Sequence, residues 1–150
     1  MSSANLARKR TLDVLAACDA AALYERYAAL EVEMPAPSPV RGPEIGMVML
    51  RGRAGGGGAL FNLGEATVSR ASVRIDSGEV GHSVILGRDT SKAQMIAHLD
   101  ALAQRADWAD RIEREFVIPA LETQNDEAAR QAAETEATRV DFFTLVRGED

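Results

Sequence analysis

The sequence has very little cysteine, no long apolar run and no excess of positive charge. Cys18 is the single cysteine among 150 residues, which excludes an intramolecular disulfide. It lies in an Ala-rich, apolar stretch that favours a small core residue over a nucleophile. No apolar run approaches the roughly 20 residues of a membrane-spanning helix. We therefore expect a chain with neither a disulfide framework nor a membrane span.

Basic residues are outnumbered, with 17 Lys and Arg against 23 Asp and Glu and a net charge of −6. A general nucleic-acid binder needs a basic surface to neutralise phosphates, so no nucleic-acid partner is expected. Charges at Arg8, Lys9, Arg10 and Asp13 interrupt any secretory apolar segment at the N-terminus. The hydrophobic content of 46% and charged content of 27% are ordinary for a globular protein. The length predicts one domain over residues 1–150, cytoplasmic by default.

Apolar and polar residues alternate from Glu44 to Asp89, and glycine clusters interrupt the pattern where a meander would turn. A period of two is typical of half-buried antiparallel strands. In the best example, Ala71, Val73 and Ile75 share one apolar face. Strands are predicted over residues 44–53, 60–63, 66–75 and 80–86, with turns at 55–58, 64–65 and 76–79.

Helical spacing dominates on both sides of this region. Helices are predicted over residues 5–17, 19–30, 91–105, 108–117 and 126–137, with Asp19, Ser91 and Asp107 as N-terminal caps and Pro119 as a break. The last helix has few bulky apolar residues, so we expect it to be exposed or pressed against another chain. Prolines at positions 35, 37, 39 and 43 predict an extended connector before the sheet. The predicted class is α+β: an antiparallel meander with helices mainly on one face, an N-terminal helical hairpin and a C-terminal strand.

The C-terminal sequence VDFFTLVRGED has the branched and aromatic residues of a strand. Phe142 and Phe143 are adjacent, so on a strand they point to opposite faces and need cover on both sides. A central or late-added strand of the same sheet is the single-chain interpretation. The Glu/Ala-rich helix before the tail, however, has too few bulky apolar residues to cover the second face of such a strand. We therefore expect Val140, Phe142, Phe143, Leu145 and Arg147 to lie at a subunit interface.

The strongest chemical feature is a run of two arginines and four glycines: Arg51, Arg53, Gly55, Gly56, Gly57 and Gly58. Successive glycine amides can form a nest for anionic oxygens, and arginine can hold phosphate bidentately. The run lacks the Gly-Lys-Ser/Thr ending of a P-loop, and no helix is predicted to follow it. A flexible hairpin connection is the alternative. Arg70 and Arg88 are further phosphate candidates, although ion pairing with Glu44, Glu65 and Asp89 would also explain them.

His82 and His98 are the only histidines, and neither has a partner at metal-ligand spacing. A metal site made wholly within this chain is therefore not expected. A lone histidine without a visible orienting partner is weak evidence for a general base. The chain also lacks GxSxG and CxxC motifs and any recognisable triad, so no catalytic residue is assigned.

Four stretches together resemble one known family: EIGMVMLRGRAGGGG, FNLGEATVSRASVR, GEVGHSVILGRD and EATRVDFFTLVRG. In this order, and over nearly the whole chain, they are similar to PhnG, the G subunit of the bacterial carbon–phosphorus lyase core complex. The most specific pieces are GEATVSRA at 64–71, GRD at 87–89 and VDFFTLVRG at 140–148. The N-terminal helices and the proline-rich connector carry little of the resemblance.

The resemblance implies a role in phosphonate catabolism, in an assembly with H, I and J subunits and more than one copy of this chain. That assembly displaces adenine from a nucleoside triphosphate (ATP) with an alkylphosphonate, which yields ribose 1-alkylphosphonate 5-triphosphate. Nucleosidase-like chemistry is usually credited to the I subunit, and the iron–sulfur J subunit later cleaves the carbon–phosphorus bond.

The function that this resemblance implies is an accessory subunit of a transferase, which binds no cofactor by itself. The alternative is a stand-alone enzyme that uses the Gly-rich loop and His82 on a phosphorylated substrate. The missing lysine, metal cluster and nucleophile count against that alternative.

Overall fold

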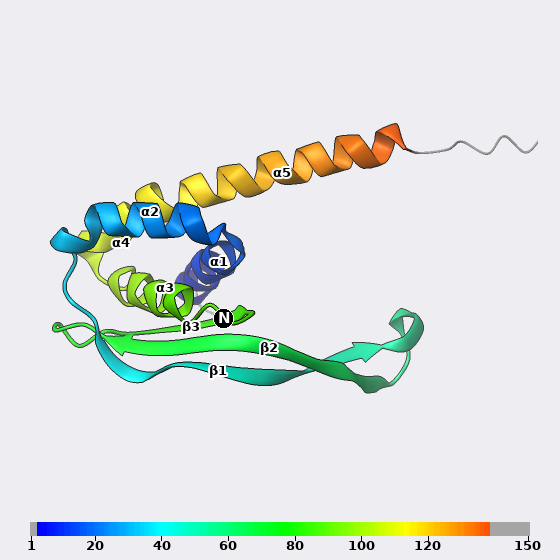
Figure 1. Cartoon of the computed structure of the whole chain (residues 1–150), viewed down its shortest axis with the longest axis horizontal. Coiled ribbons are helices and arrows are strands. Elements are labelled where there is room, and N and C mark those ends of the chain that lie inside the picture. The colour runs from blue at the N-terminus through cyan, green and yellow to red at the C-terminus, as the bar shows by residue number, and fades with distance from the viewer. Residues whose placement is uncertain (1–2, 139–150) are drawn as a thin grey trace, which may run out of the picture.

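The computed structural model describes residues 3–138, which form a long antiparallel sheet with helices on one side (Figure 1). The predicted α+β class is confirmed. None of the helices in this range combines the length and the apolar content needed to cross a membrane. In chain order the elements are α1 (Ser3–Ala17), α2 (Ala20–Leu30), η1 (Glu31–Glu33), β1 (Ser38–Arg53), η2 (Ala54–Gly56), β2 (Leu60–Arg74), β3 (Val80–Leu86), α3 (Thr90–Leu102), α4 (Ala106–Ile112), the π-helical turn η3 (Glu113–Val117) and α5 (Ile118–Ala137).

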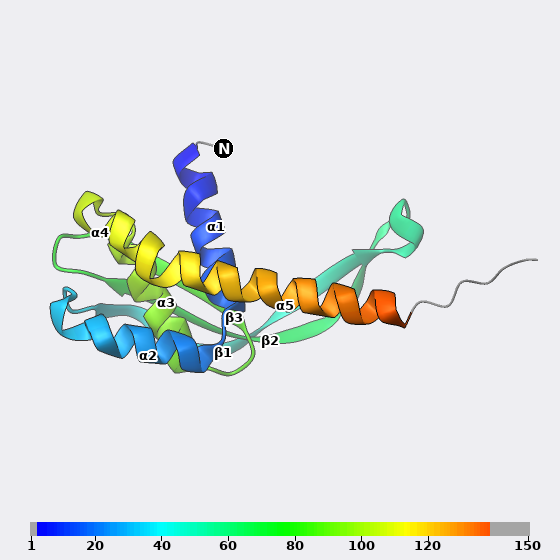
Figure 2. The ribbon, with the colours of Figure 1, turned by 90° about the horizontal axis from the view of Figure 1, so that it is seen from above.

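The sheet is the predicted meander, with strand order β1-β2-β3 and both pairs antiparallel. Its strands differ in length, since β1 and β2 have 16 and 15 residues but β3 has only 7. Within the described residues, β3 pairs only with residues 68–74 of β2. Beyond that point β1 and β2 continue as a two-stranded ribbon, which we call the arm (residues 47–67). The arm projects from the helical body in two perpendicular views (Figures 1 and 2).

The core lies between the sheet and α3, which packs against both β2 and β3. β2 contributes Ala71, Val73 and Ile75, as the alternation predicted. Gly81 of β3 allows α3 to approach closely, because a Cβ at this position would lie 1.9 Å from the carbonyl oxygen of Ala97. The largest fully buried apolar side chains are Leu15, Val73, Ile75, Ile96, Leu99, Leu102, Ile112, Phe116 and Val117.

Two aspartates fix where helices begin. Asp19 accepts a hydrogen bond from the backbone N of Ala22 at 2.9 Å, which confirms the predicted cap of α2. At α3 the cap is Asp89, whose carboxylate accepts from the backbone N of Lys92 at 2.8 Å. The predicted cap at Ser91 is wrong, because Ser91 already lies in the first helical turn.

The predicted helix boundaries near Pro119 are also wrong. Asp107 does not cap α4, since its carboxylate pairs with Arg105 instead. α4 passes through the wider turn η3 directly into α5, which begins at Ile118 rather than near residue 126. A proline clashes with the carbonyl four residues before it. That residue, Glu115, lies in η3, where the π-helical turn makes room for the ring. Residues 125–138, which form the C-terminal part of α5 and the residue after it, are exposed, as predicted for the Glu/Ala-rich helix.

Two strand boundaries differ from the prediction. β1 begins at Ser38, so Pro39 and Pro43 lie within it; among the described residues β1 is an edge strand, where proline is tolerated. The predicted turn at residues 64–65 is wrong, because β2 is continuous there. The pairs Leu50–Gly64 and Arg51–Asn62 leave one residue over, which makes a β-bulge instead of a turn. The predicted C-terminal strand lies outside the described residues.

Candidate functional site

The helices cover one face of the sheet, and within residues 3–138 no element covers the other (Figure 1). We call this second surface the open face. Because Gly81, Ser83 and Ile85 of β3 are buried, the alternate residues of that strand lie on the open face. The predicted return strand is thus confirmed, but its apolar residues Val84 and Leu86 are 59% and 76% exposed.

Five polar side chains from all three strands meet on the open face, and we call them the arginine cluster: Arg41 and Glu44 of β1, Arg70 and Ser72 of β2, and His82 of β3. A single oxygen of Glu44 accepts the Nε–H of Arg41 and the Nε–H of Arg70, both at 2.8 Å. His82 Nδ1 lies 2.8 Å from the hydroxyl of Ser72. Both arginines, Ser72 and His82 line a shallow cavity of about 270 Å³.

Two glycines of β1 shape this cluster. Residues three apart on a regular strand point to opposite faces. The register shift between Arg41 and Glu44 adds one residue, so that both side chains reach the open face. Gly42 sits in this shift with φ +71, and a Cβ there would lie 2.9 Å from the carbonyl oxygen of Arg70. A Cβ on Gly46 would lie 3.7 Å from Cζ of Arg70, so the guanidinium rests over the bare backbone of Gly46.

The electrostatics of the cluster follow from these contacts. The hydrogen bonds from Arg70 and Arg41 lower the pKa of Glu44, which keeps its carboxylate ionised. Two guanidinium groups then share one negative charge, and a net positive charge remains. Such a group is suited to binding an anion.

His82 is anchored from the helical side of the sheet. Its backbone N–H donates to Oδ2 of Asp100 at 2.8 Å, on the edge of β3 that pairs with no other strand among residues 3–138. Asp100 lies in α3 and is fully buried. Its carboxylate accepts hydrogen bonds from Nε and Nη2 of Arg8, each at 2.7 Å. An ion pair between α1 and α3 therefore holds the strand that carries His82.

The arm differs from the arginine cluster because it is apolar on both faces. Along β1, Met47 and Met49 point to one face, and Val48 and Leu50 point to the other. A two-stranded ribbon is marginally stable by itself, and exposed apolar patches of this kind mark interaction sites. The exposed apolar side chains of the arm are Met47, Val48, Met49, Leu50, Leu60, Phe61 and Leu63.

The predicted phosphate-binding residues fall in three separate places. The glycine run forms the tip of the arm, where Arg53 Nη1 donates to the carbonyl oxygen of Gly58 at 3.0 Å and closes the loop. Arg70 lies ten residues along β2 from Leu60, the partner of Arg53. At about 3.3 Å per residue this is roughly 33 Å. Arg88 follows β3, near the base of the arm. One chain therefore does not bring these residues together.

His98 takes no part in the open face. Its Nε2 lies 2.8 Å from the carbonyl oxygen of Pro35, which can only accept, so Nε2 carries the proton. Nδ1 then accepts from the hydroxyl of Tyr27 at 2.6 Å. Burial lowers the pKa of His98 and raises the pKa of Tyr27 to about 12. His98 is thus a neutral core residue that ties α3 to α2 and to the connector before β1.

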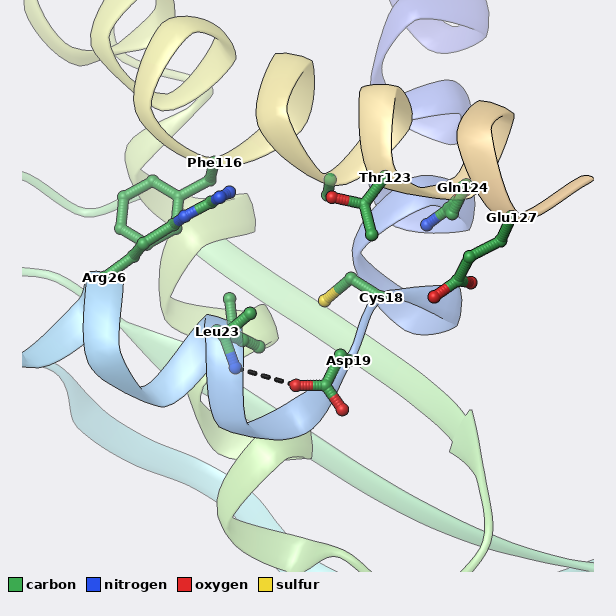
Figure 3. A pocket seen from close by; sticks show the side chains of 10 residues that line it. Cys18, Asp19, Leu23, Arg26, Phe116, Thr123, Gln124 and Glu127 are labelled. Atoms are coloured by element: carbon green, nitrogen blue, oxygen red, sulfur yellow. Dashed lines mark hydrogen bonds between the residues drawn. The ribbon is translucent and has the colours of Figure 1, made fainter. Parts of the chain in front are cut away.

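A second cavity, of about 250 Å³, lies between α2 and the start of α5 (Figure 3). Cys18 faces it together with Arg26, Gln124 and Glu127. Burial raises the pKa of the Cys18 thiol, which donates to the carbonyl oxygen of Leu15 at 3.0 Å. A thiol in this state is a poor nucleophile. Within residues 3–138, no three His, Cys, Asp or Glu side chains are placed to hold a metal ion.

Sequence reasoning identified Arg70 but missed Arg41 and Ser72 as its companions. The proline-rich connector that the sequence predicts includes Arg41, and only the register shift at Gly42 brings it beside Glu44. The alternation in residues 69–75 does place Ser72 and Arg70 on one face, and this was the available signal.

The fold and its open face define an α+β protein whose sheet leaves a charged cluster and an apolar arm exposed for binding. The chain belongs to the PhnG family, described as phosphonate metabolism protein PhnG, whose model matches residues 6–148. It is 54% identical over 120 residues to the alpha-D-ribose 1-methylphosphonate 5-triphosphate synthase subunit PhnG of Rhizobium meliloti (strain 1021), a match that covers 79% of this chain and 75% of that protein. The family resemblance seen in the sequence is confirmed.

Proposed function

We propose that this chain is an accessory subunit of a ribose 1-methylphosphonate 5-triphosphate synthase in a cytoplasmic carbon–phosphorus lyase core complex. It supports the transfer of an alkylphosphonate to the ribose C1 of ATP, with release of adenine. Family membership and the name of the Rhizobium meliloti relative, a synthase subunit, support this role. The single observation that carries the accessory role is the arm, which exposes apolar side chains on both faces.

The arm requires a partner for a simple energetic reason. Fully burying one large apolar side chain stabilises a structure by about 1.5–3 kcal/mol. Phe61 and Leu63 remain 45% and 64% exposed on a ribbon that projects from the helical body (Figures 1 and 2). We propose that another core subunit (H, I or J) covers the arm and so completes the sheet surface that this chain leaves open.

The C-terminal tail is proposed as a second contact. Its interface candidates, Val140, Phe142, Phe143, Leu145 and Arg147, lie outside the described residues. α5 precedes this tail and projects from the body in the same direction as the arm (Figures 1 and 2). The exposed surface of residues 125–138 supports a contact with the I subunit or with a second copy of this chain.

The phosphate-proximal residues are proposed to act in the assembled complex. Arg70 belongs to the arginine cluster, whereas Arg51, Arg53 and the run Gly55, Gly56, Gly57 and Gly58 are at the tip of the arm. Arg88 follows Gly87, which is hydrogen-bonded to Thr67 and Ser69 of β2, and among the described residues no contact of the Arg88 side chain with either group is found. Because roughly 33 Å separates the tip from Arg70, the two groups of one chain serve different anions or different partner surfaces.

Co-expression with the H, I and J subunits tests this proposal. This chain is expected to co-purify with them, and ATP-dependent consumption of methylphosphonate is expected only in subsets that include it. Full synthase activity in a subset without this chain would contradict the accessory role. Turnover by the chain alone would favour the stand-alone enzyme instead.

A further inference from the structure

We propose that the arginine cluster is a binding site for a phosphorus oxyanion, with Arg41, Arg70 and His82 as its donors. The geometry points to an oxyanion, and the choice of phosphate or phosphonate rests on the proposed function. The cluster lies on the open face beside the base of the arm, far from the glycine tip.

The donors are arranged to face a ligand. Arg41 and Arg70 each use Nε on Glu44, and no Nη contact of either is found within residues 3–138. A guanidinium has five N–H groups, so each arginine keeps four for another acceptor. The outer edge of a guanidinium matches two oxygens of a phosphate or phosphonate. Two such edges beside one cavity can therefore hold a single tetrahedral anion.

His82 adds a third donor. When Ser72 donates its hydroxyl proton to Nδ1, the ring proton resides on Nε2. No partner of Nε2 is found among the described residues, and the ring lines the same cavity as both arginines. The anchor from His82 N–H to buried Asp100 fixes the strand that presents the ring.

Charge selects an anion at this place. The whole chain has a net charge of −6, yet here two guanidinium groups face one carboxylate. Glu44 holds both Nε atoms and so orients the arginines, while its single charge leaves one positive charge uncompensated. Gly42 is needed for this arrangement, because it has φ +71 and a Cβ there would lie 2.9 Å from the carbonyl oxygen of Arg70.

To test the site, the full-length chain is titrated with inorganic tripolyphosphate and, separately, with methylphosphonate. Binding is measured by isothermal titration calorimetry. Loss of a charge-assisted hydrogen bond typically weakens binding by about tenfold or more. Arg41→Gln and Arg70→Gln are each expected to weaken binding of the preferred probe by that factor. Arg114→Gln, which removes the same charge from an exposed position in η3, is the matched control and should leave binding unchanged. The probe that binds more tightly identifies the group that the site accepts.

Equal weakening by Arg114→Gln would show a general charge effect and overturn the site. If neither probe binds the chain alone, the same variants are compared in the co-purified complex. There, Arg70→Gln must raise the KM for ATP or methylphosphonate without loss of assembly, and an unchanged KM overturns the site. Loss of co-purification with unchanged anion binding would make the cluster an interface only. A different result would separate the two proposals. If the wild-type chain does not co-purify with the other subunits, but tripolyphosphate binds it and both arginine variants weaken that binding, the accessory role fails and the oxyanion site stands.

Discussion

The buried carboxylate of Asp100 gives the sharpest test of how the body is held together. It is fully buried and accepts two hydrogen bonds from Arg8 at 2.7 Å and one from His82 N–H at 2.8 Å. The Arg8 side chain, in contrast, is 37% exposed. Removing either partner should therefore have unequal effects on the free energy of unfolding.

Arg8→Gln leaves a carboxylate in the protein interior without its counter-charge. Breaking a buried pair in this way typically costs about 3–5 kcal/mol. Asp100→Asn leaves an arginine whose guanidinium can turn to water. The remaining cost comes from the imperfect hydrogen bonds of the new amide to Arg8 and to the His82 N–H, and it is about 1–3 kcal/mol. Arg8→Gln is thus expected to be worse by about 2 kcal/mol, the difference between these two ranges.

Urea unfolding followed by far-UV circular dichroism measures both changes. The double variant, Arg8→Gln with Asp100→Asn, should be more stable than Arg8→Gln alone, because no charge is then left buried. Equal costs for the two single variants, or a larger cost for Asp100→Asn, would refute the assignment of the cost to the buried carboxylate.

Three further predictions concern packing, pH and turnover. Gly81→Ala places a Cβ 1.9 Å from the carbonyl oxygen of Ala97, so α3 must shift and the free energy of unfolding should fall by about 2 kcal/mol or more. Gly57→Ala, with open space around it, is the control in the same urea experiment. Burial lowers the pKa of His98 below its ordinary 6.5. As the pH falls below about 6.5, the unfolded chain takes up the proton first, and stability drops by up to about 1.4 kcal/mol per pH unit until the folded pKa is reached. Urea midpoints across this range should lose that slope in His98→Gln, and an identical slope would contradict the assignment. Arg53→Ala should slow ATP-dependent turnover of the assembled complex while leaving assembly intact; unchanged kinetics would leave Arg53 with only its contact to Gly58.

Local patterns were sufficient for much of the fold. The alternation in residues 71–75 predicted the buried face of β2, because strand side chains alternate whatever lies around them. Asp19 predicted a helix start from its own chemistry. At α3 the same reasoning chose Ser91 over Asp89. Both residues can cap a helix, and in the structure Asp89 also accepts the hydroxyl of Tyr24 at 2.6 Å, a contact from α2 that sequence alone does not show.

The open face could not be predicted in the same way. A period of two shows that a strand has two faces, but it does not show that helices cover only one of them. Gly64 has the sequence of a turn, yet pairing with Leu50 keeps β2 extended and makes the arm long. The arginine cluster depends on a register shift at Gly42, which no local rule predicts. The arginine cluster is therefore visible only in the tertiary structure, whereas most of the strands and helices that carry it are predictable from the sequence.

The central claim is that this chain works through a partner that covers the arm. Replacing Phe61 and Leu63 with alanine removes two exposed apolar side chains, and Val32→Ala removes one that is 98% exposed in η1, away from the arm. An interface anchor loses about 2 kcal/mol or more on such truncation, or roughly 30-fold in affinity.

Quantitative co-purification with the H, I and J subunits measures this effect directly. The Phe61→Ala, Leu63→Ala chain is expected to keep its wild-type circular dichroism and melting temperature but to be lost from the assembly, whereas Val32→Ala is retained. A folded arm variant that assembles at wild-type stoichiometry would contradict the account.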